Sequence, residues 1–233
     1  MLRLKNLTKS YDDKVIFQDF SMEIEKNRIT CLLGKSGCGK TTLLNVLSSI
    51  TGEFTVARSD FEKLKYSYIF QEPRLLDNYT VYKNLQFVLD SKHLSKAEMD
   101  ESIMSCLKMV EMDKYSHYYP NQLSGGMAQR VSIARAFVKD FDVLLMDEPF
   151  KGLDPTQKED IMERFLEMWR QNRKTVIYVT HNLEEALCLA YDIHVLGDSP
   201  TRIIYTSKNA YKMNDSDRDI ERNRLWEILR SQI

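Results

Sequence analysis

The segment GKSGCGKTT, residues 34–42, combines glycines, a lysine and hydroxyl side chains at a spacing suited to phosphate binding. Glycines let backbone N–H groups turn inward around phosphate oxygens, and a helix beginning near Lys40 would direct its positive end at them. Lys40 is expected to reach the β- and γ-phosphates of a nucleotide, and the Thr41 hydroxyl to ligate Mg²⁺. A tight strand-to-helix turn would explain the glycines, but not Lys40 followed by Thr41.

We call residues 34–42 the phosphate loop. The candidate nucleotide-contacting residues are Gly34, Lys35, Ser36, Gly37, Cys38, Gly39, Lys40, Thr41 and Thr42. Cys38 has two interpretations. It could be a redox-sensitive thiol near a helix N-terminus, or a small residue at a variable loop position.

Two adjacent carboxylates follow the apolar run VLLM in the segment VLLMDEP, residues 143–149. A buried strand would deliver Asp147 and Glu148 to the edge where ligands bind in open α/β sheets. There Asp147 could hold Mg²⁺, and Glu148 could orient and deprotonate an attacking water. The competing interpretation is a solvated edge or a helix cap.

Two further polar residues follow short apolar runs. His181 comes directly after TVIYVT, and its expected arrival at the same sheet edge suggests a sensor of the γ-phosphate. Gln71 follows YIF and opens a helical region, so its amide could touch Mg²⁺ or the lytic water. Either residue could instead be an ordinary loop or capping residue.

A second glycine pair lies far downstream, in LSGGMAQR, residues 123–130, which we call the signature segment. Ser124 can cap a helix running through MAQRVSIARAF, leaving N–H groups at its start for an anion. One phosphate loop is enough for one nucleotide. The second glycine pair therefore needs an anion of its own, or must reach the same anion from elsewhere.

The surrounding pattern predicts the elements that hold these segments. Alternating apolar residues in LRLKNL and VIFQDFSMEI indicate antiparallel strands, whereas ITCLL, VLLMD and TVIYVT are buried strands followed by loops and helices. The predicted fold class is α/β, with a mostly parallel sheet and an N-terminal antiparallel β region. We expect a single domain over 1–233, with its core in 1–73 and 121–233 and an all-helical insertion over 74–120. The tail DSDRDIERNRLWEIL is predicted to be an amphipathic helix that docks through Ile220, Leu225, Trp226 and Leu229.

Composition narrows the class of protein. The chain has 233 residues and a formal net charge of −1, which provides no basic field for binding nucleic acid. No stretch approaches the ~20 apolar residues of a spanning helix. Its four cysteines lack CxxC spacing, so neither a zinc site nor a disulfide framework is favoured. We expect a cytosolic protein unless a partner holds it at a membrane.

Six segments, in their order along the chain, resemble those of the nucleotide-binding subunit of ATP-binding cassette (ABC) transporters. They are the phosphate loop, Gln71, the signature segment, VLLMDEP, GLD at 152–154 and His181. This resemblance implies that Tyr11 stacks on adenine. It implies that Ser124, Gly125 and Gly126 bind the γ-phosphate of a nucleotide held by a second copy of the chain. It also implies that Asp154 lies in a loop crossing that dimer interface, and that the region after Gln71 meets a permease.

The resemblance further implies an ATPase that uses ATP and Mg²⁺, and drives a small-solute importer from the inner face of the membrane, with a solute-binding protein as an indirect partner. The segments EPFKGLD and GGMAQR are similar to those of nitrate, sulfonate, taurine and thiamine-precursor importers. Two alternatives stay open: a soluble ABC protein acting in DNA repair or translation, and a regulatory nucleotide-binding module without transport.

Overall fold

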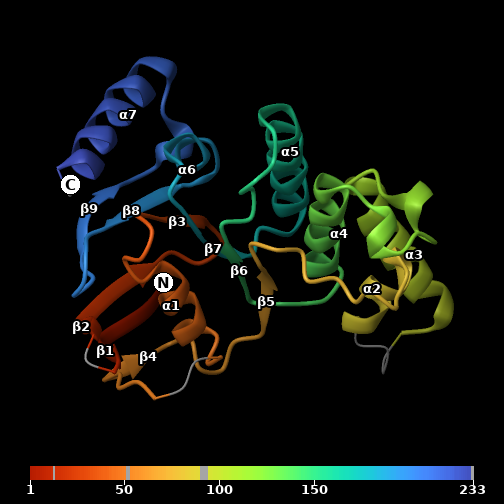
Figure 1. Cartoon of the computed structure of the whole chain (residues 1–233), viewed down its shortest axis with the longest axis horizontal. Coiled ribbons are helices and arrows are strands. Elements are labelled where there is room, and N and C mark those ends of the chain that lie inside the picture. Colours follow the sequence, from red (N-terminus) through yellow and green to blue (C-terminus); the bar gives the residue numbers. More distant parts are fainter. Residues whose placement is uncertain (13, 51–52, 90–93, 232–233) are drawn as a thin grey trace.

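The computed structural model describes residues 1–12, 14–50, 53–89 and 94–231, which form two sheets and their covering helices (Figure 1). The smaller sheet has the strand order β2-β1-β4, and both of its pairings are antiparallel. Its strands are β1 (Leu2–Tyr11), β2 (Lys14–Ile24) and the short β4 (Arg58–Ser59). The predicted N-terminal antiparallel region is therefore confirmed, and β4 adds an edge strand that the sequence had not suggested.

The larger sheet has six strands in the order β5-β6-β7-β3-β8-β9. The strands are β3 (Ile29–Leu33), β5 (Tyr66–Ile69), β6 (Val143–Asp147), β7 (Thr175–Thr180), β8 (Asp192–Leu196) and β9 (Ile203–Ser207). The first five in spatial order are parallel, and only β9 runs antiparallel, against β8. This confirms the predicted α/β class, and every residue of β3 and β7 is buried.

Seven α-helices lie in the described part of the chain. They are α1 (Lys40–Leu47), α2 (Val81–Val88), α3 (Lys96–Met109), α4 (Gly125–Phe137), α5 (Pro155–Asn172), α6 (Leu183–Leu189) and α7 (Asp215–Arg230). Short 3₁₀ turns span Asp113–Tyr115, Pro120–Gln122 and Ala210–Lys212. In Figure 1, α2 and α3 lie beyond α4, at the opposite end of the molecule from the small sheet. None of the helices within the described ranges is long and apolar enough to span a bilayer.

The buried strands divide the interior into two hydrophobic clusters. Side chains alternate across a strand, so Val176 and Tyr178 of β7 join one cluster while Ile177 and Val179 join the other. The first cluster includes residues of α2 to α7, and the second includes residues of α1 and the small sheet. Both faces of the sheet are thus covered, as a parallel sheet requires.

Removal of the α5 side chain Phe165 should strongly destabilise the fold. Its ring is fully buried and lies edge-on to Phe137 and Phe150, with centroids 6.0 and 6.5 Å away. Phe165→Ala should lower the free energy of unfolding by about 3–5 kcal/mol, because transfer and cavity costs add. Phe87→Ala is the control: that ring is 65% exposed, so its loss should change stability by about 0.5 kcal/mol or less. Urea unfolding checks both, and similar midpoints for the two variants would contradict the assignment of the core.

The prediction for the C-terminal helix was correct in position but wrong for part of its docking face. Leu225 is buried and Leu229 packs partly against the core, whereas Ile220 and Trp226 are 58% and 50% exposed. Polar contacts attach α7 instead: Arg222 pairs with Glu184 at 2.8 Å. Arg230 lies over the Trp226 ring and covers it locally. Trp226 thus has the spacing of a core residue on α7 but does not face the core.

Candidate functional site

The predicted site residues leave the large sheet at one edge. The parallel strands β3, β6 and β7 end directly before the phosphate loop, Glu148 and His181, respectively, and β5 ends two residues before Gln71. The carboxyl ends of parallel strands meet at the same edge, where crevices form in open α/β sheets. The topology thus brings four distant sequence segments to one place.

The phosphate loop joins β3 to α1, and its last glycine has a conformation that other residues rarely adopt. Gly39 is the N-cap of α1 with φ 96°, and it provides no side-chain hydrogen bond to the first turn. A Cβ atom there would come within 2.8 Å of Ile16 and 3.0 Å of the Thr201 hydroxyl. Glycine is needed for both reasons, and the first N–H groups of α1 keep their capacity to bind an anion.

Lys40 lies at the centre of this loop and is 6% exposed. Its Nζ donates to the backbone carbonyls of Gly34 and Lys35, at 2.7 and 2.6 Å, so the ammonium crosses the concave side of the loop. A cavity of about 200 Å³ opens there, lined by Ile16, Ser36, Gly37, Gly39, Lys40, Thr41, Thr42 and Glu148. A fixed cation and helix N–H groups therefore border the same small space.

Thr41 and Asp147 meet across this edge, with the Thr41 hydroxyl donating to Oδ1 of Asp147 at 3.1 Å. Burial raises the pKa of the Asp147 carboxyl and the adjacent Glu148 adds to the rise, while the bond from Thr41 opposes it. Two neighbouring hard oxygen donors fit Mg²⁺, which usually binds one or two protein groups together with substrate phosphates and water. No cluster of three or more His, Cys, Asp or Glu side chains suited to a metal occurs among the described residues, so phosphate and water oxygens would have to complete the shell.

Glu148 is buried and adopts a left-handed backbone conformation with φ 43°. Its Oε1 lies 3.1 Å from Nδ1 of His181, and its Oε2 lies 2.9 Å from Nζ of Lys151. Burial by itself would raise the pKa of the Glu148 carboxyl, but Lys151 and His181 outweigh burial and hold the pKa below its usual range. The carboxylate is therefore ionised at neutral pH, beside the phosphate loop and in contact with the predicted sensor.

Cys38 packs inside the protein rather than presenting a reactive thiol. It is 2% exposed, and burial raises its pKa. Its backbone carbonyl accepts a 2.6 Å hydrogen bond from the Thr201 hydroxyl, which lies in the loop between β8 and β9. These features favour the packing interpretation of Cys38, since reactivity needs an accessible thiolate.

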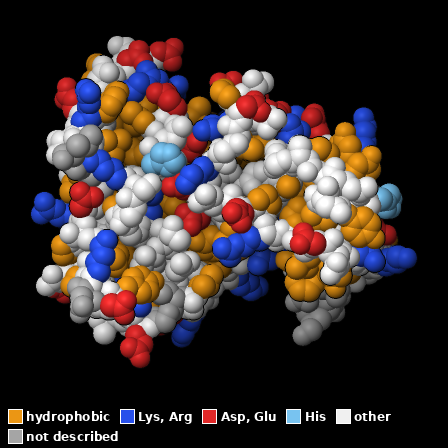
Figure 2. Space-filling view, in the orientation of Figure 1, with side chains coloured by type: hydrophobic (Ala, Val, Ile, Leu, Met, Phe, Trp, Pro, Cys, Tyr) orange, Lys and Arg blue, Asp and Glu red, His pale blue; other side chains and the backbone are white. Residues whose placement is uncertain are grey.

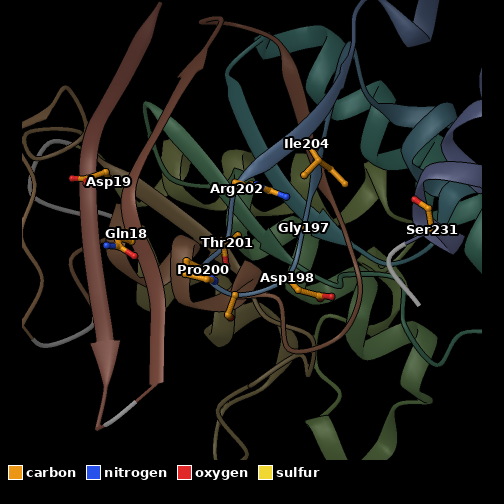
Figure 3. A pocket seen from close by; sticks show the side chains of 10 residues that line it. Gln18, Asp19, Gly197, Asp198, Pro200, Thr201, Arg202, Ile204 and Ser231 are labelled. Carbon is orange, nitrogen blue, oxygen red and sulfur yellow. The ribbon is translucent and has the colours of Figure 1, made fainter.

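Thr201 also borders a larger cavity of about 840 Å³ beside the phosphate loop (Figure 3). Gln18 and Asp19 of β2 line one side, the segment 197–202 lines another, and Ser231 lies near the chain end. None of the residues predicted from the sequence lines this cavity. The smaller cavity at the phosphate loop, and not this one, coincides with the candidate chemistry.

Two predicted residues lie apart from these contacts. Tyr11 ends β1 and is 44% exposed, with the Lys9 ammonium 4.5 Å from its ring centroid. Gln71 is exposed in the loop after β5 and makes no side-chain hydrogen bond within the described residues. The fold places Gln71 at the correct sheet edge without joining its amide to Thr41 or Asp147.

The signature segment lies away from the phosphate loop of the same chain. Ser124 caps α4, accepting from the N–H of Met127 at 3.3 Å as predicted, and a Cβ atom added to Gly125 would meet no other atom within 4 Å. Ser124 and Gly126 border a separate cavity of about 230 Å³, also lined by Arg130 and Gln157. Asp154 caps α5 by accepting from the N–H of Gln157 at 3.0 Å. The two helix starts predicted to bind anions thus stand in two different places on one chain.

Three contributors to the site were missed by sequence reasoning. Ile16 reaches the phosphate loop from the small sheet, and Thr201 reaches it from the loop after β8. Neither residue has a local sequence signal, because both contacts span long stretches of chain. Lys151 does carry a weak signal, since it follows Glu148 by three residues within EPFKGLD.

Comparison with known proteins gives consistent matches. A family model described as ABC transporter matches residues 17–151. The chain is 34% identical over 220 residues to the Fe(3+) ions import ATP-binding protein FbpC of Fusobacterium nucleatum, covering 91% of this chain and 59% of that protein. It is 35% identical over 194 residues to the aliphatic sulfonates import ATP-binding protein SsuB of Bacillus cereus, covering 81% of this chain and 76% of that protein.

Among solved structures, the chain is similar to the dimeric structure of MJ0796, described as a bacterial ABC transporter cassette. The TM-score is 0.78 at 27% sequence identity, covering 92% of this chain and all of that one. The two relatives and the solved cassette each match at least 81% of the chain.

Proposed function

This chain belongs to the ABC transporter family, and from that premise we propose that it is an ATP-hydrolysing subunit that powers a small-solute importer by closing as a dimer around two ATP molecules. The phosphate loop of one copy and the signature segment of the other would enclose each nucleotide. ATP that binds only between two copies tightens the dimer by mass action, and hydrolysis releases it. The names of the two import proteins and the dimeric solved cassette support this proposal.

The separation of the two helix starts is the observation that carries the proposal. The phosphate loop and Ser124–Gly126 border different cavities, with no lining residue in common. Ser124 uses its side chain to cap α4, yet a Cβ atom added to Gly125 would meet open space, so the start of this helix is accessible. A second copy can supply the anion that this helix start would bind.

Within each site, the chain's own residues divide the chemistry. Lys40 exchanges its backbone carbonyl partners for β- and γ-phosphate oxygens, and Tyr11 stacks on the adenine. Thr41 and Asp147 would hold Mg²⁺, with Gln71 reaching it from the same sheet edge, and the bound ion would offset the negative charge of the phosphates. Glu148 accepts a proton from the attacking water, and His181, 3.1 Å from it, contacts the γ-phosphate side.

A mixing experiment tests whether each site is built from two copies. Gly125→Glu places a carboxylate where the partner's γ-phosphate would bind, and open space around Gly125 should leave the fold intact. That variant and Lys40→Ala should each be inactive alone. Mixed, they should regain a substantial fraction of ATPase activity, because one of the two shared sites then has both halves intact. Release of phosphate from ATP is the measurement.

The control mixture combines Lys40→Ala with Glu148→Gln, two changes on the same half of the site. Every pairing of those chains lacks a working half at both sites, so activity should stay absent. Recovery in this control, or none in the first mixture, would contradict the shared-site dimer.

Exposed apolar side chains mark the surface we propose for the permease. Hydrophobic side chains gather over the helices on the right of Figure 2. Among the described residues of 74–120, the large exposed ones are Leu76, Tyr79, Phe87, Tyr118 and Tyr119. The segments that carry them lie side by side, because the backbone N–H groups of Val81 and Tyr82 bond to the carbonyls of Tyr118 and Ser116, and the rings of Tyr79 and Phe87 lie 6.0 Å apart. Such a patch on the proposed helical subdomain, 74–120, suits a peripheral attachment to membrane subunits.

The solute subgroup also belongs to the proposal. EPFKGLD and GGMAQR favour the nitrate, sulfonate, taurine and thiamine-precursor importers, and the sulfonate relative supports that group. The Fe(3+) relative is nearly as similar, at 34% against 35% identity. Selectivity lies in the permease and the solute-binding protein, so identifying the molecule held by a co-encoded binding protein is the direct test.

A further inference from the structure

We propose that Lys158 and Glu185 form a positioning pair that fixes the loop carrying His181 and so sets the rate of ATP hydrolysis. The inference rests on the function proposed above, in which His181 acts beside Glu148. Neither member of the pair lines the cavity at the phosphate loop. Both would therefore act through the His181 loop and not by touching the nucleotide.

The pair is short and largely buried. Nζ of Lys158 lies 2.7 Å from Oε1 of Glu185, and their side chains are 23% and 4% exposed. Replacing a buried ion pair by neutral groups is often neutral for stability, since desolvation offsets the attraction. Fold stability alone therefore gives no strong reason for a lysine and a glutamate at these positions.

The second oxygen of Glu185 reaches the His181 loop. Oε2 accepts a 2.8 Å hydrogen bond from the Thr180 hydroxyl, whose oxygen in turn accepts from the N–H of Asn182 at 3.0 Å. Asn182 closes the network, because its side-chain oxygen accepts from the N–H of Glu185 at 3.2 Å. The residues on both sides of His181 are thus tied to one carboxylate.

One more bond and the anchoring of Lys158 in α5 stiffen this arrangement from outside the loop. The buried Tyr178 hydroxyl donates to the backbone carbonyl of Glu185 at 2.9 Å. Lys158 belongs to the first turns of α5, four residues after the cap Asp154. His181 itself is half exposed and has Glu148 as its side-chain partner, so its position depends on the backbone that carries it.

The test variant replaces both charges at once, Lys158→Met with Glu185→Gln, so that no unpaired charge is left buried. Because small misplacements of a catalytic group are costly, kcat should fall by about 10²-fold, while KM for ATP should change by about twofold or less. Lys158→Arg alone, with Glu185 unchanged, keeps the ion pair and should retain most of kcat. If the double variant does not fold, Glu185→Asp keeps the charge but shortens the reach, and it should lose kcat in the same way.

A double-mutant cycle separates positioning from general weakening. In a His181→Ala background, measured by single-turnover hydrolysis, the same double replacement should lower kcat no further, while the shift in thermal midpoint stays the same. An equal fold-loss of kcat in both backgrounds would overturn the proposal. So would an unchanged kcat in the wild-type background.

The matched control is the ion pair between Lys208 and Asp192, 3.0 Å apart, whose carboxylate is 2% exposed. Asp192 begins β8, at the sheet edge opposite the phosphate loop. Lys208→Met with Asp192→Asn should leave kcat unchanged, whatever its effect on the thermal midpoint. Loss of kcat in this control as large as that in the test variant would assign the effect to buried charge in general, and would also overturn the proposal.

Discussion

Glu148→Gln should nearly abolish ATP turnover while ATP binding is retained. The amide keeps the shape of the carboxylate but cannot accept a proton from water, and loss of a general base costs typically about 10²–10⁴-fold in rate. The variant also loses the ion pair with Lys151. A contact with His181, which lies 3.1 Å from Glu148 in the unaltered protein, can persist. Phosphate release and equilibrium binding of a fluorescent ATP analogue measure the two properties separately.

The same variant should accumulate as a dimer when ATP is present. If ATP holds two copies together and hydrolysis separates them, blocking hydrolysis leaves the closed state populated. Gel filtration with ATP should therefore show a dimer, and with ADP a monomer.

Glu221→Gln is the matched control for this variant. It changes another buried carboxylate, one that accepts from Tyr205 at 3.0 Å, and should preserve turnover. Only monomer for Glu148→Gln with ATP would refute the shared-site dimer, whereas wild-type turnover would refute the role of Glu148.

Lys40→Ala should lose nucleotide affinity rather than the hydrolytic step alone. The ammonium is buried in the phosphate loop within 2.7 Å of two carbonyl oxygens, and no other lysine of the described residues lines that cavity. A hydrogen bond from a charged group contributes about 1.5–3 kcal/mol, so affinity for ATP should fall by at least about tenfold. Calorimetric titration with ATP measures this loss directly.

Lys65→Ala removes the same charge from the opposite edge of the sheet, just before β5, and should bind ATP as the unaltered protein does. Equal losses for the two lysine variants would mean that net charge, and not position, controls affinity. Unchanged binding by Lys40→Ala would remove its assigned role.

Local sequence patterns were sufficient to predict the sheet edge. ITCLL, VLLMD and TVIYVT are continuous apolar runs, and each is a buried strand ending at a candidate residue. The juxtaposition of Thr41 with Asp147 and of Glu148 with His181 then follows from parallel pairing. Strand order did not need to be known, because every parallel strand ends at the same edge.

Contacts made between distant segments could not be predicted in this way. Thr201 bonds to Cys38 across 163 positions, and no pattern near either residue indicates it. Trp226 shows the opposite failure, in which a local pattern predicted a contact that is not made. Its apolar spacing predicted a place in the core, but the side chain is exposed and Arg230 lies over its ring. Residues 112–120 lie in the insertion expected to be all-helical, yet their helical pieces are the 3₁₀ turn Asp113–Tyr115 and the start of the 3₁₀ turn Pro120–Gln122.

The first turns of α5 have a consequence for how two nucleotides would influence each other. A Cβ added to Gly126 would come within 2.7 Å of Gln157, whose chain neighbour Lys158 bonds to Glu185. In the proposed dimer, Gly126 serves the nucleotide held by the partner, while the Glu185 network serves the nucleotide held by the chain itself. The adjacent residues Gln157 and Lys158 thus contact the parts of the chain that serve two different nucleotides. Binding of one ATP should therefore change the affinity for the other, so the two binding events should be cooperative. Thermodynamic linkage requires that coupling to be equal in both directions.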